Sequence, residues 1–135
     1  MLHIENAQVD SQPVATIEGR PNTGLFFVKP LMRGESMALL EVRVQAGAAS
    51  LIHTHSHESL VYVVTGRLKT TINNETFVLG PGDVCRHPRG AGHRVEALED
   101  SIFVEVKSPP IEFRQVFGGF DVGTSDVYGP SDEMP

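Results

Sequence analysis

The glycines and prolines of this chain restrict its fold more than any other feature, because they divide it into short apolar runs. The 13 glycines and 9 prolines fall between these runs, several of which alternate apolar and polar residues, the period of a half-buried strand. We predict strands at 25–28, 36–45, 60–64, 67–73, 75–79, 84–87, 93–97 and 101–106, with a turn at Asn73-Asn74, where asparagine tolerates positive φ. About eight strands at this spacing indicate an all-β fold, an antiparallel barrel or jelly roll.

The length of the chain indicates one domain. With 135 residues and a mass of 14.7 kDa, it has room for a single hydrophobic core. We expect residues 1–35 to form an N-terminal segment with short strands and residues 36–108 to form the barrel. Residues 109–135 are expected to form a tail that packs on the barrel or on a partner subunit and frays at its end. Its aromatic residues are Phe113, Phe117, Phe120 and Tyr128.

The charge composition argues against several classes of partner. A net charge of −6 and a pI near 5.4 are opposite to the basic surface that nucleic-acid-binding proteins need. No run approaches the roughly 20 apolar residues of a membrane span, and the N-terminus lacks the pattern of a signal peptide. The single cysteine, Cys85, cannot form an internal disulfide. We therefore expect a cytoplasmic protein that binds neither nucleic acid nor membrane.

Histidines are concentrated in two short windows. The first window contains His53, His55 and His57, the second contains His87 and His93, and the sixth histidine, His3, is near the N-terminus. Residues two apart on an extended chain point the same way, so His53 and His55 direct two imidazoles to one side, as chelation of one metal ion requires. A third ligand must come from elsewhere. His93 opens a separate predicted strand, from which it could reach the same ion.

Two motifs extend these windows into the pattern of a known family. The first is Gly47, five residues, His53-Thr54-His55, three residues, Ser59, six residues and Gly66. The second is Gly82, five residues, Pro88-Arg89-Gly90, two residues, His93, three residues and Ala97. In these spacings the chain resembles the cupins, whose two short motifs carry the metal site. It departs from the family at Ser59, where cupins usually have Glu or Gln, and at Ala97, where they usually have Asn.

The resemblance to cupins implies a double-stranded β-helix that holds one divalent transition metal, Zn, Fe, Ni or Mn, on His53, His55 and His93. Ser59 is a poor ligand unless deprotonated, so it is expected to hydrogen-bond a bound water or to point away. His57 shares the parity of His53 and His55 and could fill the vacant position instead. The segments HTHSHESLVYVVTGRL and ALEDSIFVEVKSPP most resemble the pectin-degradation cupins that linearise unsaturated uronates, a group that has Gln where this chain has Ser59.

Three further residues are candidates for moving a proton or binding substrate. In the predicted strand 84–87, Cys85 and His87 share one face, and the pattern leaves open which face points inward. If His87 faces the metal, its ordinary pKa near 6.5 suits a general base. Tyr62 could place its hydroxyl in the barrel, and Arg94 could bind a substrate carboxylate. Other cations that could do the same are Arg67, Lys69 and Arg86, while Cys85 is expected to be a small buried residue rather than a nucleophile.

We expect a metal-dependent enzyme that acts on a small, polar, carboxylate-bearing metabolite such as a sugar acid, by isomerase or lyase chemistry. One alternative is a three-histidine Fe(II) dioxygenase, as found among cupins, although few aromatic residues are present to line a hydrophobic oxygen pocket. Another is a cupin that binds a small ligand without catalysis. In each case a neutral three-imidazole face favours an anionic ligand. Small cupins usually pair through their sheets, so the resemblance also implies a homodimer.

Overall fold

The fold comes from a computed structural model in which residues 1–111 and 116–117 are described. Within these residues a short 3-10 helix, η1 (Asn6–Gln8), precedes nine strands. The strands are β1 (Gln12–Ile17), β2 (Arg20–Arg33), β3 (Ala38–Val44), β4 (Glu58–Thr65), β5 (Leu68–Ile72), β6 (Glu75–Leu79), β7 (Val84–His87), β8 (His93–Ala97) and β9 (Ser101–Ser108). From β3 onward the bounds agree with the predicted strands to within two residues at each end.

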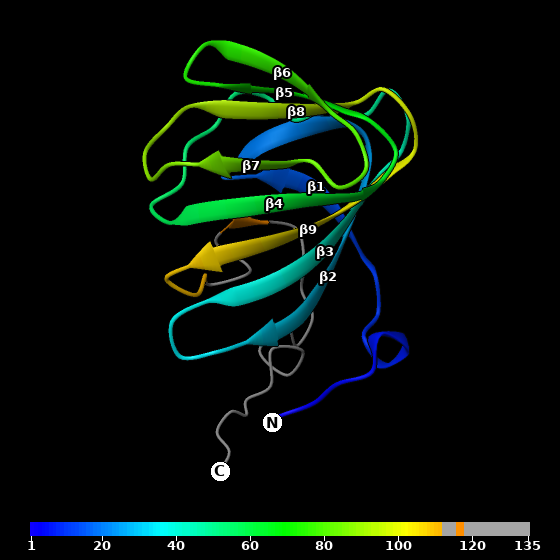
Figure 1. Cartoon of the computed structure of the whole chain (residues 1–135), viewed down its shortest axis with the longest axis vertical. Coiled ribbons are helices and arrows are strands. Elements are labelled where there is room, and N and C mark those ends of the chain that lie inside the picture. Colours follow the sequence, from blue (N-terminus) through cyan, green and yellow to red (C-terminus); the bar gives the residue numbers. More distant parts are fainter. Residues whose placement is uncertain (112–115, 118–135) are drawn as a thin grey trace.

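The strands form two antiparallel sheets that enclose one interior. The larger sheet has the order β1-β2-β3-β9-β4-β7 and the smaller one the order β6-β5-β8. Figure 1 shows the smaller sheet at the top of the molecule, with β7, β4, β9, β3 and β2 descending below it. The predicted all-β fold, the double-stranded β-helix of a jelly roll, is confirmed.

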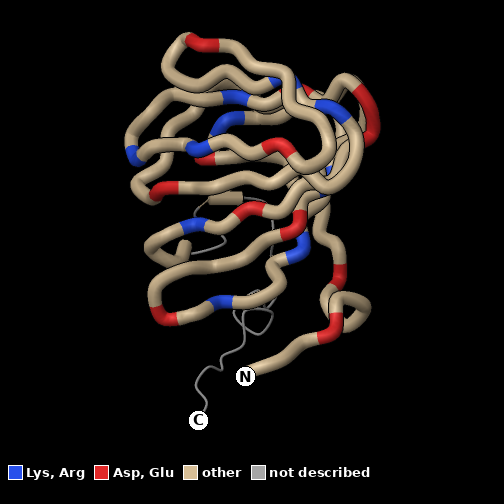
Figure 2. The backbone as a smooth tube through the Cα atoms, in the orientation of Figure 1, with Lys and Arg blue, Asp and Glu red and all other residues tan. Residues whose placement is uncertain are grey.

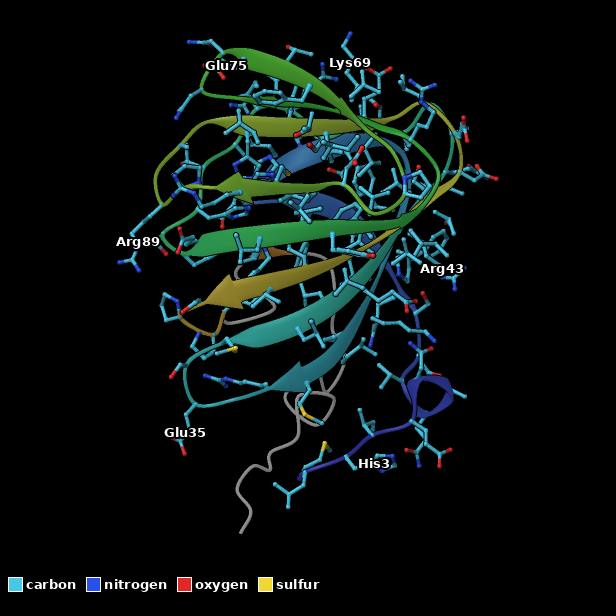
Figure 3. The ribbon with its side chains drawn as sticks, viewed as in Figure 1. His3, Glu35, Arg43, Lys69, Glu75 and Arg89 are labelled. Atoms are coloured by element: carbon cyan, nitrogen blue, oxygen red, sulfur yellow. The ribbon has the colours of Figure 1, made fainter. Side chains whose placement is uncertain are left out.

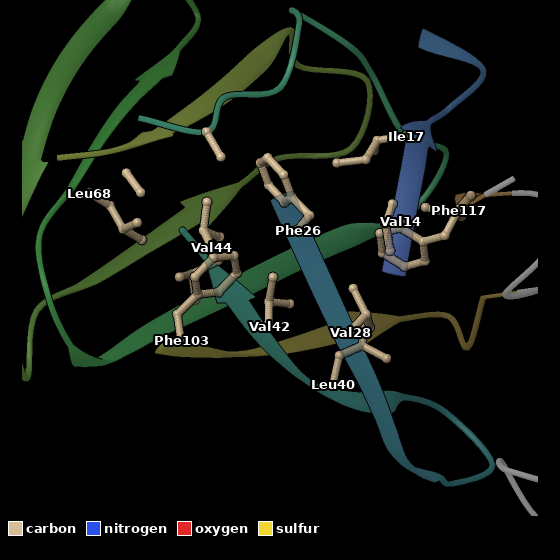
Figure 4. Packing of buried hydrophobic residues seen from close by; sticks show 14 of the residues in the cluster. Val14, Ile17, Phe26, Val28, Leu40, Val42, Val44, Leu68, Phe103 and Phe117 are labelled. Atoms are coloured by element: carbon tan, nitrogen blue, oxygen red, sulfur yellow. The ribbon is translucent and has the colours of Figure 1, made fainter. Parts of the chain in front are cut away.

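Alternation along the strands decides which side chains face the interior. In β9 every second residue is buried, beginning at Ser101, and β4 alternates in the same way from Ser59 to Val63. Val42, Val63 and Phe103 are among the inward residues that form the core, and Figure 4 shows part of this cluster. The turn between β5 and β6 has the predicted form, because Asn73 and Asn74 have φ of 50° and 67°.

The N-terminal segment differs from the prediction of short strands. β2 has 14 residues and pairs with β1 on one side and β3 on the other, so the segment 1–35 contributes two strands to the larger sheet. Proline and glycine were expected to interrupt it. They are accommodated because Pro30 lies at an irregularity in the pairing with β3, where a missing N–H is tolerated, and Gly24 adopts a φ of 73°.

The described part of the C-terminal segment packs on the barrel. Ile111, Val116 and Phe117 are buried and belong to the core cluster, and Phe117 lies in the same group as Val14 and Ile17 (Figure 4). Phe117 therefore lies against the barrel, and the packing of the tail as a whole stays a prediction. The residues Phe113, Phe120, Tyr128 and 131–135 lie outside the described residues.

The exterior carries charges of both signs. In Figure 2 the Lys and Arg positions are interspersed with the Asp and Glu positions over strands and loops. Among the described residues, no helix has the length and apolar character that a membrane crossing requires.

Candidate metal centre

The two histidine windows meet inside the barrel. The segment that carries His53 joins β8 through a pair of backbone hydrogen bonds, in which His53 and His93 each donate an N–H to the other's carbonyl at 3.0 Å. This pairing brings their rings to a centroid distance of 4.3 Å. With His55 they form a buried group whose candidate ligand atoms lie within 4.8 Å of one another. The three predicted metal ligands are therefore brought together.

The first histidine window has the alternating burial of a strand but is not part of one. β4 begins only at Glu58, yet His53, His55 and His57 are buried while Thr54 and Ser56 between them are exposed. The expected alternation therefore places all three imidazoles inside. Glu58 points outward, as its parity requires, and forms an exposed ion pair with an arginine of β7.

Hydrogen bonds determine which nitrogen of each ring is free. Nδ1 of His53 donates to the carbonyl of Leu51 at 2.7 Å, and Nδ1 of His93 donates to the carbonyl of Ala91 at 3.1 Å. A carbonyl oxygen only accepts, so both Nδ1 atoms carry the proton. Nδ1 of His55 lies 2.5 Å from the carboxylate of Glu18, the type of carboxylate–histidine contact found behind metal ligands. Each ring therefore presents an unprotonated Nε2.

Burial keeps these imidazoles neutral. It lowers the pKa of His53 and of His93 to about 4, and the nearby histidines oppose protonation further. The pKa of His55 is also lowered, first by burial and then by the positive charge of Lys107. Burial raises the pKa of Glu18, and Lys107 partly offsets this rise. Metal ions bind the neutral imidazole, so at neutral pH the three rings are ready to coordinate without first losing a proton.

This donor set fits a divalent transition metal. Three buried imidazoles with free Nε2 atoms match the ligand preference of Zn, Fe and Ni among the predicted metals, and they leave at least one position for water or substrate. The match rests on the orientation of the rings and on the acceptors that hold their Nδ1 protons.

The two predicted candidates for a fourth ligand are both engaged by Lys107. Lys107 is 1% exposed, and its Nζ donates to Nε2 of His57 at 3.0 Å and to Oγ of Ser59 at 3.2 Å. Burial and the charge of Lys107 lower the pKa of His57 to about 3, so this ring is neutral and accepts the bond. The third bond of Nζ goes to Oε2 of Glu105 at 2.9 Å.

Sequence reasoning missed Lys107 and Glu105. Both are buried in β9 at inward positions, in register with Ser101 and Phe103. The alternation of SIFVEVKS contained this signal, since the parity that buries Phe103 also turns the two charged residues inward. Burial alone would raise the pKa of Glu105, but Lys107 and His87 lower it to about 2, so the carboxylate is ionised.

The inward face of β7 is the one that carries Cys85 and His87. Val84 and Arg86 are exposed on the other face, which resolves the alternative that the sequence left open. Nδ1 of His87 has no hydrogen-bond partner and lies 3.8 Å from Oε2 of Glu105. Burial lowers the pKa of His87 to about 4, so the expected value near 6.5 is wrong. Burial also raises the pKa of the Cys85 thiol to about 12, which agrees with a packing residue rather than a nucleophile.

Tyr62 and Arg94 lie away from the histidines. Tyr62 is 52% exposed on the outer face of β4, and Arg94 donates its Nε–H to the carbonyl of Ser50. Neither lines the cavity that contains the histidines. Strand parity is the reason, because each has the parity opposite to the inward residue beside it, Val61 or His93. These two predictions of catalytic residues are corrected accordingly.

The other predicted cations also lie outside the cavity. Arg86 pairs with Glu58 on the exterior at 3.1 Å. Figure 3 shows Lys69 at the outside of the smaller sheet, and it shows His3 on the N-terminal segment, apart from the strands. Among the described residues that line the cavity, the permanent cation is Lys107.

The interior cavity is small and mostly apolar. Its volume is about 40 Å³, enough for an ion or a few waters but far below the roughly 300–1,000 Å³ of a site that holds a metabolite. Its polar lining includes the histidines, Glu105 and Lys107, and its apolar lining includes Phe26, Phe103 and Phe117. A shallow outer hollow of about 280 Å³, lined by Glu18, Arg20, Ile52, His53 and Thr54, shares His53 with this cavity.

Comparison with known proteins identifies the family. A family model for the cupin domain (Cupin_2) matches residues 40–106. An RmlC-like cupin from Shewanella frigidimarina has the same fold, with a TM-score of 0.73 at 18% identity over 84% of this chain and 95% of that one. This chain is a small cupin-domain protein. Its similarity to KdgF from Halomonas sp. is greater in sequence, at 26% identity and a TM-score of 0.73 over 84% of this cupin and 97% of KdgF.

Curated relatives of the cupin include enzymes. Oxalate decarboxylase OxdC of Bacillus subtilis is 31% identical over 78 residues, which are 54% of this chain and 20% of that enzyme. The cupin spans between 20% and 59% of the length of the curated relatives it matches. These similarities establish that the chain contains a cupin domain and that proteins related to it include enzymes.

Proposed function

We propose that this cupin is a metal-dependent enzyme that converts a small carboxylate-bearing metabolite, such as a sugar acid, by isomerase or lyase chemistry. The observation that carries the proposal is the set of three free Nε2 atoms on His53, His55 and His93 in one buried group. A divalent ion held there would polarise a carbonyl or hydroxyl of the substrate. The similarity to oxalate decarboxylase, whose name states a small carboxylate as its substrate, supports this class of ligand.

In this proposal His87 moves the proton. Its ring is neutral at pH 7, its Nδ1 has no partner, and it stacks on His93 at a centroid distance of 3.9 Å. A neutral imidazole with a free lone pair can accept a proton from a substrate bound beside it. Glu105, 3.8 Å from Nδ1 of His87, would stabilise the imidazolium that results.

Substrate entry requires part of the barrel to open. A sugar acid does not fit in about 40 Å³, and Phe117 lines the cavity from a segment outside the two sheets. That segment is attached near the histidines, because the backbone N–H of Glu18 donates to the carbonyl of Val116 at 2.7 Å. We propose that displacement of Phe117 admits the substrate from the side of the outer hollow that borders His53.

A three-histidine Fe(II) dioxygenase is the second candidate, favoured by one observation. The scarcity of aromatic residues argued against it, yet three of the seven phenylalanines, Phe26, Phe103 and Phe117, line the cavity beside the histidines. Such a lining is the kind of surface that accommodates dioxygen. The identity of the resident metal separates the two candidates.

The first test is metal content measured by plasma mass spectrometry on untagged protein purified without chelator. We expect about one divalent transition metal per chain in the wild type and in His3→Ala, and about none in His55→Ala, since three imidazoles are the minimum for this type of site. His3→Ala is the matched control, because it removes an exposed histidine far from the cluster. Equal metal contents in all three proteins would reject the proposed centre.

The second test is turnover of an unsaturated uronate, followed by proton NMR. We expect conversion by the metal-loaded wild type, and a loss of about 100-fold or more in His87→Gln, which keeps the metal ligands but removes the proton acceptor. Oxygen consumption with a β-diketone or thiol in the iron-loaded protein, and no uronate conversion, would favour the dioxygenase instead. Saturable uronate binding without turnover under any metal would leave a non-catalytic binding protein.

A further inference from the structure

Lys107, which forms a buried ion pair with Glu105, is a charged residue of the interior that the proposed reaction does not use. Both side chains are almost fully buried and both line the cavity of the histidines. Removing two charges from water is costly unless each is fully paired. Nζ of Lys107 meets this condition, because its three N–H groups have three acceptors, on Glu105, His57 and Ser59.

Glu105 would be a strong ligand for a divalent ion if it were free. Its carboxylate is ionised, it lines the same cavity as His53, His55 and His93, and carboxylate oxygens bind every metal that three imidazoles bind. Its oxygen nevertheless lies outside the group of donor atoms formed by the three histidines. It is turned to Lys107, at 2.9 Å.

Ser59 and Lys107 form a complementary pair. They lie directly opposite each other on β4 and β9, and Ser59 is 1% exposed. The small serine side chain leaves the space that the lysine ammonium occupies, and its hydroxyl accepts one of the three bonds of Nζ. A longer acidic side chain at residue 59 would reach into the same space. Ser59, at the position of the usual cupin ligand, and the buried Lys107 therefore depend on each other for space and hydrogen bonding.

We infer that Lys107 is a positioning residue: its ammonium holds the Glu105 carboxylate, with His57 and Ser59, away from the three-imidazole face. A metal bound there has three protein ligands, and its other positions stay open to two donor atoms of a substrate. The inference rests on the metal centre of the proposed function. The charges of Lys107 and Glu105 cancel each other, and the three imidazole ligands are neutral. No protein ligand therefore balances the positive charge of the ion. The open positions thus favour an anionic, chelating group such as a hydroxy acid.

The test uses Co²⁺ as the probe metal, because its visible absorption reports the ligands around it. The comparison includes the wild type and three variants, which are Glu105→Gln, Lys107→Met and the double variant Glu105→Gln/Lys107→Met. Competition with a chelator measures the Co²⁺ affinity of each protein. The double variant replaces the ion pair with neutral groups of similar size and controls for loss of the pair itself. Oxalate is the chelating anion added to each Co²⁺-loaded protein.

In Lys107→Met we expect Glu105 to reach the ion, so Co²⁺ binds about tenfold or more tighter, its spectrum changes, and oxalate no longer perturbs it. The double variant returns to the wild-type affinity within about threefold and keeps the wild-type spectrum and response to oxalate. Glu105→Gln leaves the affinity and spectrum of the wild type unchanged, and a loss of affinity in this arm would reject the inference even if Lys107→Met does not fold.

Two results overturn the inference, and they differ from failure of the metal centre. One is a folded Lys107→Met protein with wild-type Co²⁺ affinity and spectrum. The other is a tenfold loss of Co²⁺ affinity in Glu105→Gln, which would make Glu105 a ligand in the wild type. If the wild type itself binds no Co²⁺, the proposed function fails, and the inference with it.

Discussion

At the scale of single residues, the hydrogen-bond acceptors behind the histidines matter as much as the histidines, because they determine which ring nitrogen is free. Two of the three Nδ1 protons go to backbone carbonyls, which no substitution at those positions removes. The third goes to the side chain of Glu18, which adopts a left-handed φ of 52°. A non-glycine residue in that region is uncommon, and here it aims the carboxylate at His55. Glu18 is therefore the one acceptor of the three that mutation can test.

Replacing this acceptor is expected to weaken metal binding. In Glu18→Gln an amide replaces the carboxylate that orients His55 and raises the basicity of its Nε2, and loss of such a partner lowers metal affinity by about 10- to 100-fold. The measurement is competition for Zn²⁺ against a chromophoric chelator. Glu58→Gln is the control, since Glu58 pairs with an exposed arginine on the outer face and its loss should leave affinity unchanged. Equal Zn²⁺ affinities in the two variants would show that Glu18 does not support the metal site.

The sequence could predict the three candidate ligands more readily than the groups that surround them. His53, His55 and His93 follow from two spaced motifs, because a motif records positions along the chain. Lys107 and Glu105 stand outside both motifs, and only the parity of β9 relative to Phe103 marks them as buried. The acceptor of the His55 proton could not be inferred at all, since Glu18 reaches His55 across 37 positions of the chain.

At the scale of strands and turns, two glycines with the same backbone geometry separate conformational strain from steric contact. Gly66, directly after β4, has a φ of 90°, and a Cβ there would lie 2.2 Å from Oγ of Ser101 and 2.5 Å from the carbonyl of Asp100. Gly82 has a φ of 86°, and nothing lies within 4 Å of the corresponding Cβ. Both are motif glycines. The structure therefore assigns a packing role to the first that the second lacks.

We expect Gly66→Ala to destabilise the fold more than Gly82→Ala. A left-handed conformation costs a non-glycine residue about 1–2 kcal/mol, which both variants pay in full. Gly66→Ala must also displace Ser101, a buried residue whose Oγ accepts a hydrogen bond from the backbone N–H of Arg67. The free energy of unfolding of this variant therefore falls by about 3 kcal/mol or more. Urea denaturation followed by circular dichroism measures both. Equal losses would show that the start of β9 shifts freely.

Strand prediction succeeded where the apolar pattern was regular and failed where proline and glycine residues wrongly suggested a break. From β3 to β9 the strands are separated by Gly, Pro, Asn or Asp residues, so local rules were sufficient. In β2 the prolines and glycine suggested breaks, but pairing with β1 and β3 on both sides sustains 14 residues of strand. Long-range pairing thus overrides local propensity in the N-terminal segment, as it commonly does in sheets.

At the scale of the whole molecule, the barrel concentrates five of its six histidines in one interior. His53, His87 and His93 have pKa values lowered to about 4, and His57 to about 3, with burial as the main cause. In the unfolded chain each would titrate near 6.5. Between these values the unfolded chain binds more protons than the folded one, so protons favour unfolding in this window.

The metal-free protein is therefore expected to lose stability steadily as the pH falls from about 6.5 towards 4, and to show little dependence on these groups above pH 7. A histidine whose pKa falls from 6.5 to about 4 on folding contributes a loss of about 2 kcal/mol at pH 5. Urea denaturation in the presence of a chelator, at several values between pH 7.5 and 5, measures the slope. His87→Gln should reduce it by about one proton. A free energy of unfolding that stays constant from pH 7 to 5 would mean that the interior admits water and that the histidines titrate there as in the unfolded chain.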